Sequence, residues 1–178
     1  MITFAPQKNS MTDIVKTYEN GGKIEVYRLV NQSAGDYKKI YACCEYFAKQ
    51  GAHTVITPTF LVETIGNPIY EEIYASLRNT QYWGKCPDFK VNGAWYEHEG
   101  YDLTKDLTEN QKRADTFCWM MKRGVKQSDR IIVEDCNVVR RYARRTIFNR
   151  VNIEHQNITE VYIRTEEGLE LLYKKGTD

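Results

Sequence analysis

Three carboxylate side chains fall close together in the segment Pro87–Glu99, which reads PDFKVNGAWYEHE. Asn92-Gly93 within it is the pair preferred in two-residue type I′ turns, because both turn positions need a positive φ. Such a turn fixes the register of a hairpin, so Asp88 lies opposite Glu97, and Glu99 follows on the same face. Clustered carboxylate oxygens suit Mg²⁺ or Mn²⁺, and these ions can activate water for phosphodiester cleavage.

The same hairpin has a plainer interpretation. Like charges that face each other in a sheet destabilise it by about 0.2–1 kcal/mol per pair. A chain tolerates this cost through solvent, through a neighbouring cation such as Lys90, or through a bound ion. Because charged residues are mostly exposed, a solvated outer face stays open as an alternative. The other face carries His98 among apolar residues, where a hydrogen-bonded core histidine is favoured over a catalytic one.

The elements that position the hairpin follow from hydrophobic periodicity. Alternating or continuous apolar runs predict strands, and apolar residues repeated every three to four positions predict helices. The expected strands are 23–30, 53–57, 129–134, 159–165 and 169–174, and the expected helices are 37–50, 67–77, 108–122 and 137–149. This order predicts one α/β (α+β) domain over 23–178, with a central mixed β-sheet, a β-hairpin at 88–99 and flanking helices. Residues 1–22 are weakly patterned and are expected to form a separate N-terminal segment.

Composition limits the class of partner. The chain has 178 residues, 42% of them hydrophobic, which is enough to bury a core. Lys plus Arg (25) nearly equals Asp plus Glu (24), so the net charge of +1 excludes coating of nucleic acid by bulk charge. The five cysteines, at 43, 44, 86, 118 and 136, show no C-x-x-C spacing, so no zinc knuckle is indicated. Without a long apolar run or a signal peptide, we expect a cytoplasmic protein that does not enter a membrane.

A local basic patch is predicted in the helix at 137–149. Arg140 and Arg144 are four residues apart, and so are Arg141 and Arg145, so the four form two adjacent rows on the helix surface. Guanidinium groups in such rows can bind a phosphate backbone. The alternative is an exposed amphipathic helix whose arginines pair with acidic neighbours.

Several short motifs follow one another over about residues 37–174. They are YFAKQG at 46–51, HTVITP at 53–58, PDF at 87–89 with NG and Glu97 after it, GVKQSDRIIV at 124–133 and ITEVYI at 158–163. Their order and spacing resemble the C-terminal nuclease-type toxin domains of contact-dependent inhibition proteins and related polymorphic toxins. The resemblance implies a compact nuclease-like α/β fold, cleavage of RNA, often tRNA, in preference to DNA, and an immunity protein as a partner.

The resemblance also implies roles for individual residues. Asp88 and Glu97 match the acids of the family's Pro-Asp and Glu-x-Lys motifs, so they are the expected catalytic and metal-binding residues, and Gln127 matches a recurring glutamine expected to contact substrate. Glu99 stands where active members have a lysine, which stabilises charge at the scissile phosphate. Lys90 lies on the same predicted face and is our candidate to replace that lysine, with Glu99 kept in the candidate catalytic set.

Two functional hypotheses result. The first is a metal-assisted RNA nuclease, in which Asp88 and Glu97 hold Mg²⁺ or Mn²⁺ and the arginine helix grips the strand. The second is a catalytically inactive module of the same fold that binds nucleic acid or protein, in which Glu99 records a lost activity. Such toxin domains usually end a long secreted protein, whereas this chain begins at Met1. We therefore expect either a relative encoded by a mobile element or phage, or a domain excised from a longer protein.

Overall fold

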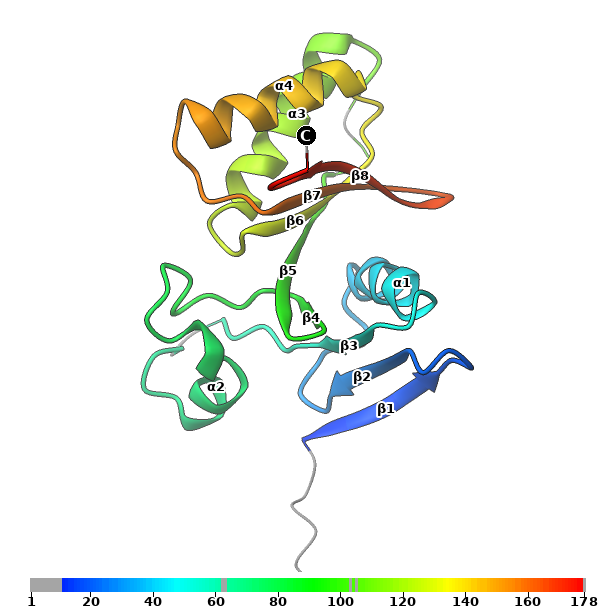
Figure 1. The fold of residues 1–178 in the computed structure, drawn as a ribbon, viewed down its shortest axis with the longest axis vertical. Coiled ribbons are helices and arrows are strands. Elements are labelled where there is room, and N and C mark those ends of the chain that lie inside the picture. Colours follow the sequence, from blue (N-terminus) through cyan, green and yellow to red (C-terminus); the bar gives the residue numbers. More distant parts are fainter. Residues whose placement is uncertain (1–10, 62–63, 103, 105, 178) are drawn as a thin grey trace, which may run out of the picture.

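The computed structural model describes residues 11–61, 64–102, 104 and 106–177. These residues form one mixed β-sheet with helices packed on it (Figure 1). The strands are β1 (Thr12–Thr17), β2 (Lys23–Tyr27), β3 (His53–Ile56), β4 (Phe89–Val91), β5 (Ala94–Glu99), β6 (Arg130–Glu134), β7 (Glu160–Thr165) and β8 (Gly168–Lys174). The helices are α1 (Tyr37–Ala48), α2 (Pro68–Ile73), the short 3₁₀ helix η1 (Ala75–Leu77), α3 (Asn110–Gly124) and α4 (Arg140–Asn152).

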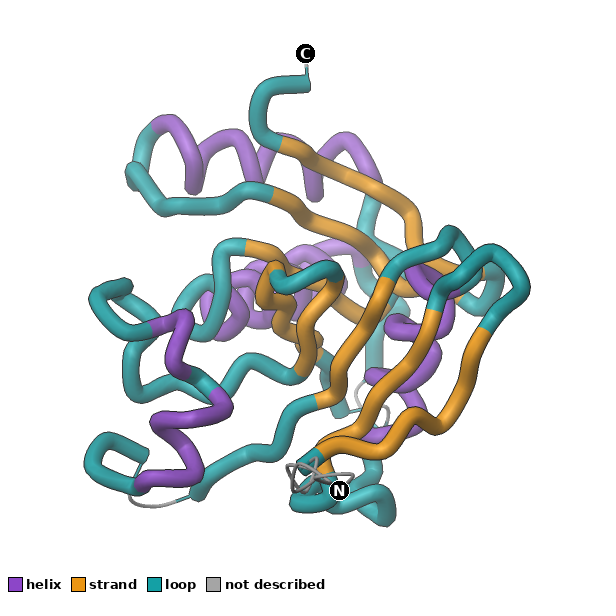
Figure 2. Tube along the Cα trace, turned by 60° about the horizontal axis from the view of Figure 1, so that its bottom comes forward, coloured by secondary structure: helices purple, strands orange, loops and turns teal. Residues whose placement is uncertain are grey.

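The eight strands lie side by side in chain order (Figure 2). Strand β2 is parallel to β3, and β6 is parallel to both β5 and β7, whereas the other neighbouring strands are antiparallel. The predicted α/β class with a central mixed sheet is therefore confirmed. Strand β1 pairs with β2, so the sheet begins inside the predicted N-terminal segment 1–22 rather than at residue 23.

The hairpin forms in the predicted register. Asn92 and Gly93 have φ of 48° and 85°, as a type I′ turn requires. Phe89 pairs with Tyr96 and Val91 with Ala94. Strand β5 then continues past the end of β4 and joins the part of the molecule that holds β1 to β4 to the part that holds β6 to β8 (Figure 1).

Helices cover both faces of the sheet. Helix α1 packs on one face in a cluster that includes Phe47, Phe89 and Tyr96, and α3 and α4 pack on the other face around residues such as Phe117 and Ile131. Each such side chain contributes about 1.5–3 kcal/mol when it is fully buried. The hairpin therefore lies between two layers of helices.

The face of β5 that carries the carboxylates is buried, so the alternative of a solvated outer face is wrong. Trp95, Glu97 and Glu99 are 7%, 8% and 2% exposed. Helix α3 reaches this face because it ends in glycine: a Cβ on Gly124 would lie 2.7 Å from Ile131 Cγ2 and 3.4 Å from Glu99 Cγ. A larger residue at position 124 would push α3 away from the sheet.

Two further observations concern the cysteines and the membrane. All five cysteines are free thiols. In the part of the chain that the structure describes, no helix combines the length and apolar character needed to cross a bilayer.

Candidate functional site

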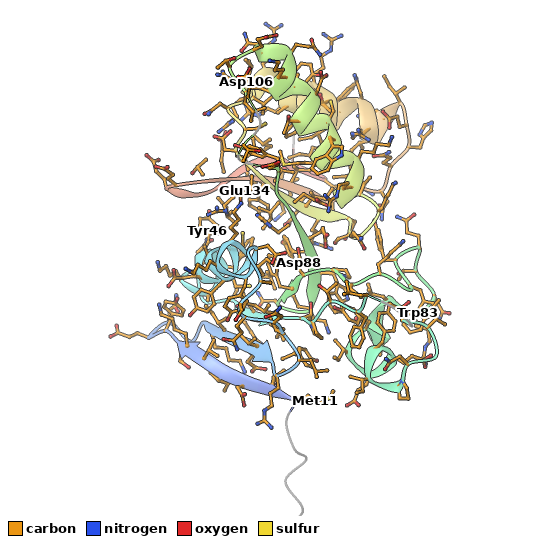
Figure 3. All side chains as sticks on the ribbon, turned by 180° about the vertical axis from the view of Figure 1, so that it is seen from behind. Met11, Tyr46, Trp83, Asp88, Asp106 and Glu134 are labelled. Atoms are coloured by element: carbon orange, nitrogen blue, oxygen red, sulfur yellow. The ribbon has the colours of Figure 1, made fainter. Side chains whose placement is uncertain are left out.

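The three hairpin carboxylates come together at the carboxyl end of β5. Asp88 immediately precedes β4, whose first residue Phe89 pairs with Tyr96, and Figure 3 places it in the central part of the molecule, between Met11 at one end and Asp106 at the other. The backbone N–H of His98 donates a hydrogen bond of 2.9 Å to Asp88 Oδ2. The site is thus built on paired strands, which fix its residues more firmly than a loop would.

All three carboxyl groups have raised pKa values. Burial raises the pKa of Asp88 first of all, and the negative charges of Asp36 and Glu99 raise it further against the opposing effect of His98. Burial, and then the charges of Asp88 and Glu99, raise the pKa of Glu97 well above its usual range. Burial also raises the pKa of Glu99 to about 7, although Arg123 opposes the shift. Ionising all three carboxyl groups at once therefore costs free energy.

One carboxylate oxygen in this cluster has no hydrogen-bond partner among the described residues. Glu97 Oε2 is buried and makes no hydrogen bond with any residue that the structure describes. A buried carboxylate oxygen without a partner is costly unless a proton or a cation accompanies it. This observation fits the predicted metal-binding role of Glu97.

A metal here would take few ligands from the protein. Among the described residues, no group of three or more His, Cys, Asp or Glu side chains is arranged to hold an ion. Asp88 and Glu97 would supply two carboxylates, which is usual for Mg²⁺, since it retains several waters and accepts phosphate oxygens from its substrate. The donor set thus suits Mg²⁺ or Mn²⁺ better than a metal that needs a complete protein cage.

The cation that pairs with the cluster is Arg123 and not the expected Lys90. Lys90 Nζ lies 4.1 Å from the centre of the Trp95 ring and donates to the Ile73 carbonyl oxygen at 3.3 Å. None of the ion pairs between described residues joins Lys90 to a carboxylate. Arg123 of α3 instead brings its Nε to 3.2 Å from Glu99 Oε2. No sequence pattern selects Arg123, because its approach to Glu99 depends on how α3 packs against β5.

The opposite face of β5 holds a second charged group that the sequence did not reveal. His98 Nε2 lies 2.6 Å from Glu134 Oε1, and Arg164 donates through NH2 to Glu134 Oε2 at 2.9 Å. Lys39 Nζ lies 3.9 Å from the same carboxylate. Burial favours neutral Glu134, but the hydrogen bonds from His98 and Arg164 outweigh it and lower the pKa of Glu134 to about 2. We call these four residues the Glu134 network.

The Glu134 network confirms that His98 is a hydrogen-bonded core histidine. Because an ionised carboxylate only accepts hydrogen bonds, Nε2 of His98 carries a proton. The ring is therefore fixed by Glu134 while the backbone of the same residue holds Asp88. The strand pattern offered one signal that could have found this network, because Glu134 and Arg164 lie near the carboxyl ends of two predicted strands. In the structure these strands pair in parallel, with the two residues opposite each other.

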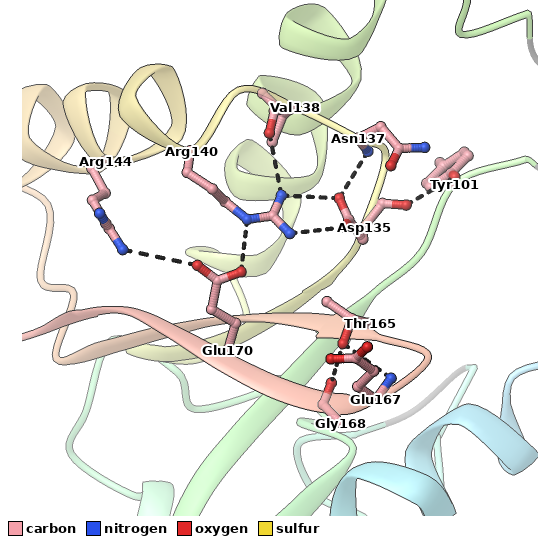
Figure 4. Close-up of polar contacts among 10 residues, drawn as sticks. All are labelled: Tyr101, Asp135, Asn137, Val138, Arg140, Arg144, Thr165, Glu167, Gly168 and Glu170. Carbon is pink, nitrogen blue, oxygen red and sulfur yellow. Dashed lines mark hydrogen bonds and ion pairs between the residues drawn. The ribbon is translucent and has the colours of Figure 1, made fainter.

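Two of the four candidate arginines are paired with acidic residues (Figure 4). Arg140 donates to Asp135 Oδ2 at 2.8 Å through NH2 and to Glu170 Oε2 at 2.7 Å through Nε. Arg144 NH2 lies 3.8 Å from Glu170 Oε1. For these two residues the alternative of an amphipathic helix with acidic neighbours is confirmed.

The other two arginines leave a smaller basic surface than the sequence suggested. Arg141 and Arg145 are exposed, and neither is in an ion pair with another described residue. Tyr142 is 39% exposed beside them, and Phe148 is 59% exposed on the same helix. Val139 is exposed as well, because it precedes the helix, which begins at Arg140.

Gln127 lies in the turn that follows α3. Its Oε1 is buried and has no hydrogen-bond partner among the described residues. The next residue, Ser128, donates through Oγ to the carbonyl oxygen of Trp95 at 2.9 Å, so this turn is fixed against β5. The turn that contains Gln127 thus lies against β5. The Gln127 amide oxygen is free to accept a hydrogen bond, because no described residue donates one to it.

Comparisons of the chain with protein-family models, with curated proteins and with solved structures give no match. The resemblance to toxin nucleases therefore stays an expectation drawn from the sequence. The functional argument rests on the geometry of the residues described above.

Proposed function

We propose that this chain cleaves RNA by metal-assisted hydrolysis of phosphodiester bonds, with Asp88 and Glu97 as the metal-binding residues. The observation that carries the proposal is the carboxylate cluster, in which three acidic groups repel one another and one buried oxygen, Glu97 Oε2, has no hydrogen-bond partner among the described residues. Mg²⁺ or Mn²⁺ bound there supplies charge neutralisation at the phosphate and lowers the pKa of water. The preference for RNA comes from the family resemblance.

The chain's own residues have distinct parts in this function. Asp88 is held in place by the backbone of His98. Glu99, with a pKa of about 7, exchanges a proton readily near neutral pH, as a general acid or base must. Arg123, which pairs with Glu99, supplies positive charge beside the cluster in place of the lysine expected from the resemblance.

The proposal is tested by incubating the chain with labelled RNA and with DNA of the same sequence. We expect cleavage of RNA with Mg²⁺ or Mn²⁺ and none with excess EDTA. Cleavage that persists in EDTA would contradict the role of the metal. Absence of cleavage with every divalent ion tried would contradict the enzyme.

One observation favours a second function, the non-catalytic binding module. Glu99 is a buried acid where the resemblance expects a cation, and its ion pair with Arg123 uses a charge that could otherwise face the phosphate. In this case RNA binds in a salt-sensitive manner and is not cleaved. The cleavage assay and a binding assay on the same RNA separate the two functions.

Both functions require the exposed arginines of α4. We expect the double variant Arg141→Gln/Arg145→Gln to weaken RNA binding and to lower the slope of log affinity against log salt by about 2, because two phosphate contacts are lost. Fluorescence anisotropy of labelled RNA at several KCl concentrations in EDTA measures both quantities. The matched control is Arg140→Gln/Arg144→Gln, which removes the same charge from the paired row. Equal losses from the two double variants would show that only net charge matters.

A further inference from the structure

A pocket of about 290 Å³ opens beside Asp88, where the carboxyl ends of β2 and β3 meet the start of α1. Its walls combine apolar side chains with two carboxylates, and they include Asp36, Tyr37, Ile40, Ile56, Pro58 and Asp88. Pockets with apolar walls and a few polar groups bind small organic molecules or parts of larger ones. The pocket shares Asp88 with the carboxylate cluster, so a group bound in it lies next to one of the two proposed metal-binding residues.

Asp36 is a polar residue of this pocket whose side chain does not cap α1. It precedes α1, but its side chain makes no capping hydrogen bond to the helix. None of the side-chain hydrogen bonds or ion pairs between described residues involves its carboxylate, which is exposed. An ionised carboxylate can accept two parallel hydrogen bonds, one at each oxygen. The pocket therefore suits a flat ring that carries two adjacent N–H donors on one edge.

We propose that this pocket binds a guanine base of the RNA substrate, with Asp36 accepting from guanine N1–H and N2–H. Guanine presents these two donors side by side on its Watson–Crick edge, whereas adenine, cytosine and uracil each present a single donor group there. Proteins recognise unstacked RNA bases by such edge contacts combined with stacking on aromatic side chains, and Tyr37 is the aromatic residue in this wall.

The inference rests on the proposed function, because it is the position beside Asp88 that favours an RNA base over another ligand. An arginine side chain of a partner protein also carries two parallel N–H donors and would meet the same carboxylate. The base is favoured because Asp88, a proposed metal-binding residue, forms part of the pocket wall and then lies beside the bound nucleotide.

The test measures binding of GMP, AMP, CMP and UMP to the full chain by isothermal titration calorimetry in EDTA, where no cleavage takes place. We expect GMP to bind at least about tenfold more tightly than the others, and Asp36→Asn to weaken GMP binding by at least about tenfold, as the loss of a hydrogen bond to a charged group predicts. The variant is expected to fold, because the Asp36 side chain does not cap α1. The matched control is Asp115→Asn, which removes an exposed aspartate of α3.

Three results would overturn the inference: equal binding of the four nucleotides, GMP binding that Asp36→Asn leaves unchanged, or tighter binding of N-acetylarginine amide than of GMP. Mapping of RNA cleavage products separates this inference from the proposed function. Cleavage without GMP binding or guanine preference would refute the pocket assignment and support the nuclease. GMP binding to a chain that cleaves nothing would support the pocket and refute the nuclease.

Discussion

Replacing Glu97 with glutamine is expected to lower RNA cleavage by at least about 100-fold, the usual size of a lost electrostatic contact in a catalytic site. The same substitution is expected to raise the stability of the chain in EDTA at neutral pH, because burial and the charges of Asp88 and Glu99 raise the pKa of Glu97 in the folded chain. Glutamine removes the free-energy cost of protonating this carboxyl on folding. Asp88→Asn should act in the same two directions. Single-turnover cleavage rates and thermal melting followed by circular dichroism measure the two effects.

The opposite signs of these effects make the prediction specific. If Glu97 served only to fill space in the core, replacing its carboxylate by an amide of the same shape would lower neither the cleavage rate nor the stability of the chain. Glu167→Gln, in the exposed turn between β7 and β8, is the control for loss of one negative charge. A Glu97→Gln variant that cleaves RNA at the normal rate would remove Glu97 from the site.

The pH dependence of stability gives an independent check on the cluster. The folded-state pKa values of its carboxyls lie above the usual value of 4.5 for glutamate and reach about 7 at Glu99. Between these two pH values the folded chain binds more protons than the unfolded chain, so the free energy of unfolding falls as pH rises. Glu97→Gln should reduce this slope, and Mg²⁺ should restore stability at pH 7. A stability that rises over this interval would contradict the assignment.

Glu134→Gln is expected to destabilise the chain by about 3–5 kcal/mol, the cost of removing one partner from a buried ion pair. The substitution leaves the half-buried Arg164 without its anion and weakens the hydrogen bond from the buried His98. Urea unfolding at pH 7 measures the change. Glu134 does not disturb the pH experiment above, because its pKa of about 2 confines its own contribution to lower pH.

Glu170→Gln is the matched control for this prediction. Glu170 also contacts two cations, Arg140 and Arg144, but its side chain is 38% exposed, against 10% for Glu134. Ion pairs in such exposed positions contribute about 0–1 kcal/mol. Similar losses from the two variants would show that burial does not set the strength of the Glu134 network.

Local sequence patterns determined most elements of the fold. Asn92-Gly93 fixed the hairpin register, because few other residue pairs adopt two positive φ values in succession. Strand β1 escaped prediction because it is an edge strand with mostly exposed residues, so it carries no buried alternation. Helix α4 begins later than predicted, since Asn137 has a φ of 57° and cannot continue a helix.

The candidate site was only partly determined by the sequence. The hairpin pattern put Asp88, Glu97 and Glu99 on one face, because the alternation of a strand is a local property. Whether that face meets solvent was decided by α3, which packs on it through Gly124.

The charge partners were likewise decided by the tertiary structure. Helical spacing aligned Arg140 with Arg144, and in the structure both form ion pairs with Glu170 of β8. Arg141 and Arg145 stay exposed. A sequence sets the faces of each element through its backbone period. The solvent exposure and counter-charge of a side chain depend on elements distant in the chain, and these meet only when the core packs.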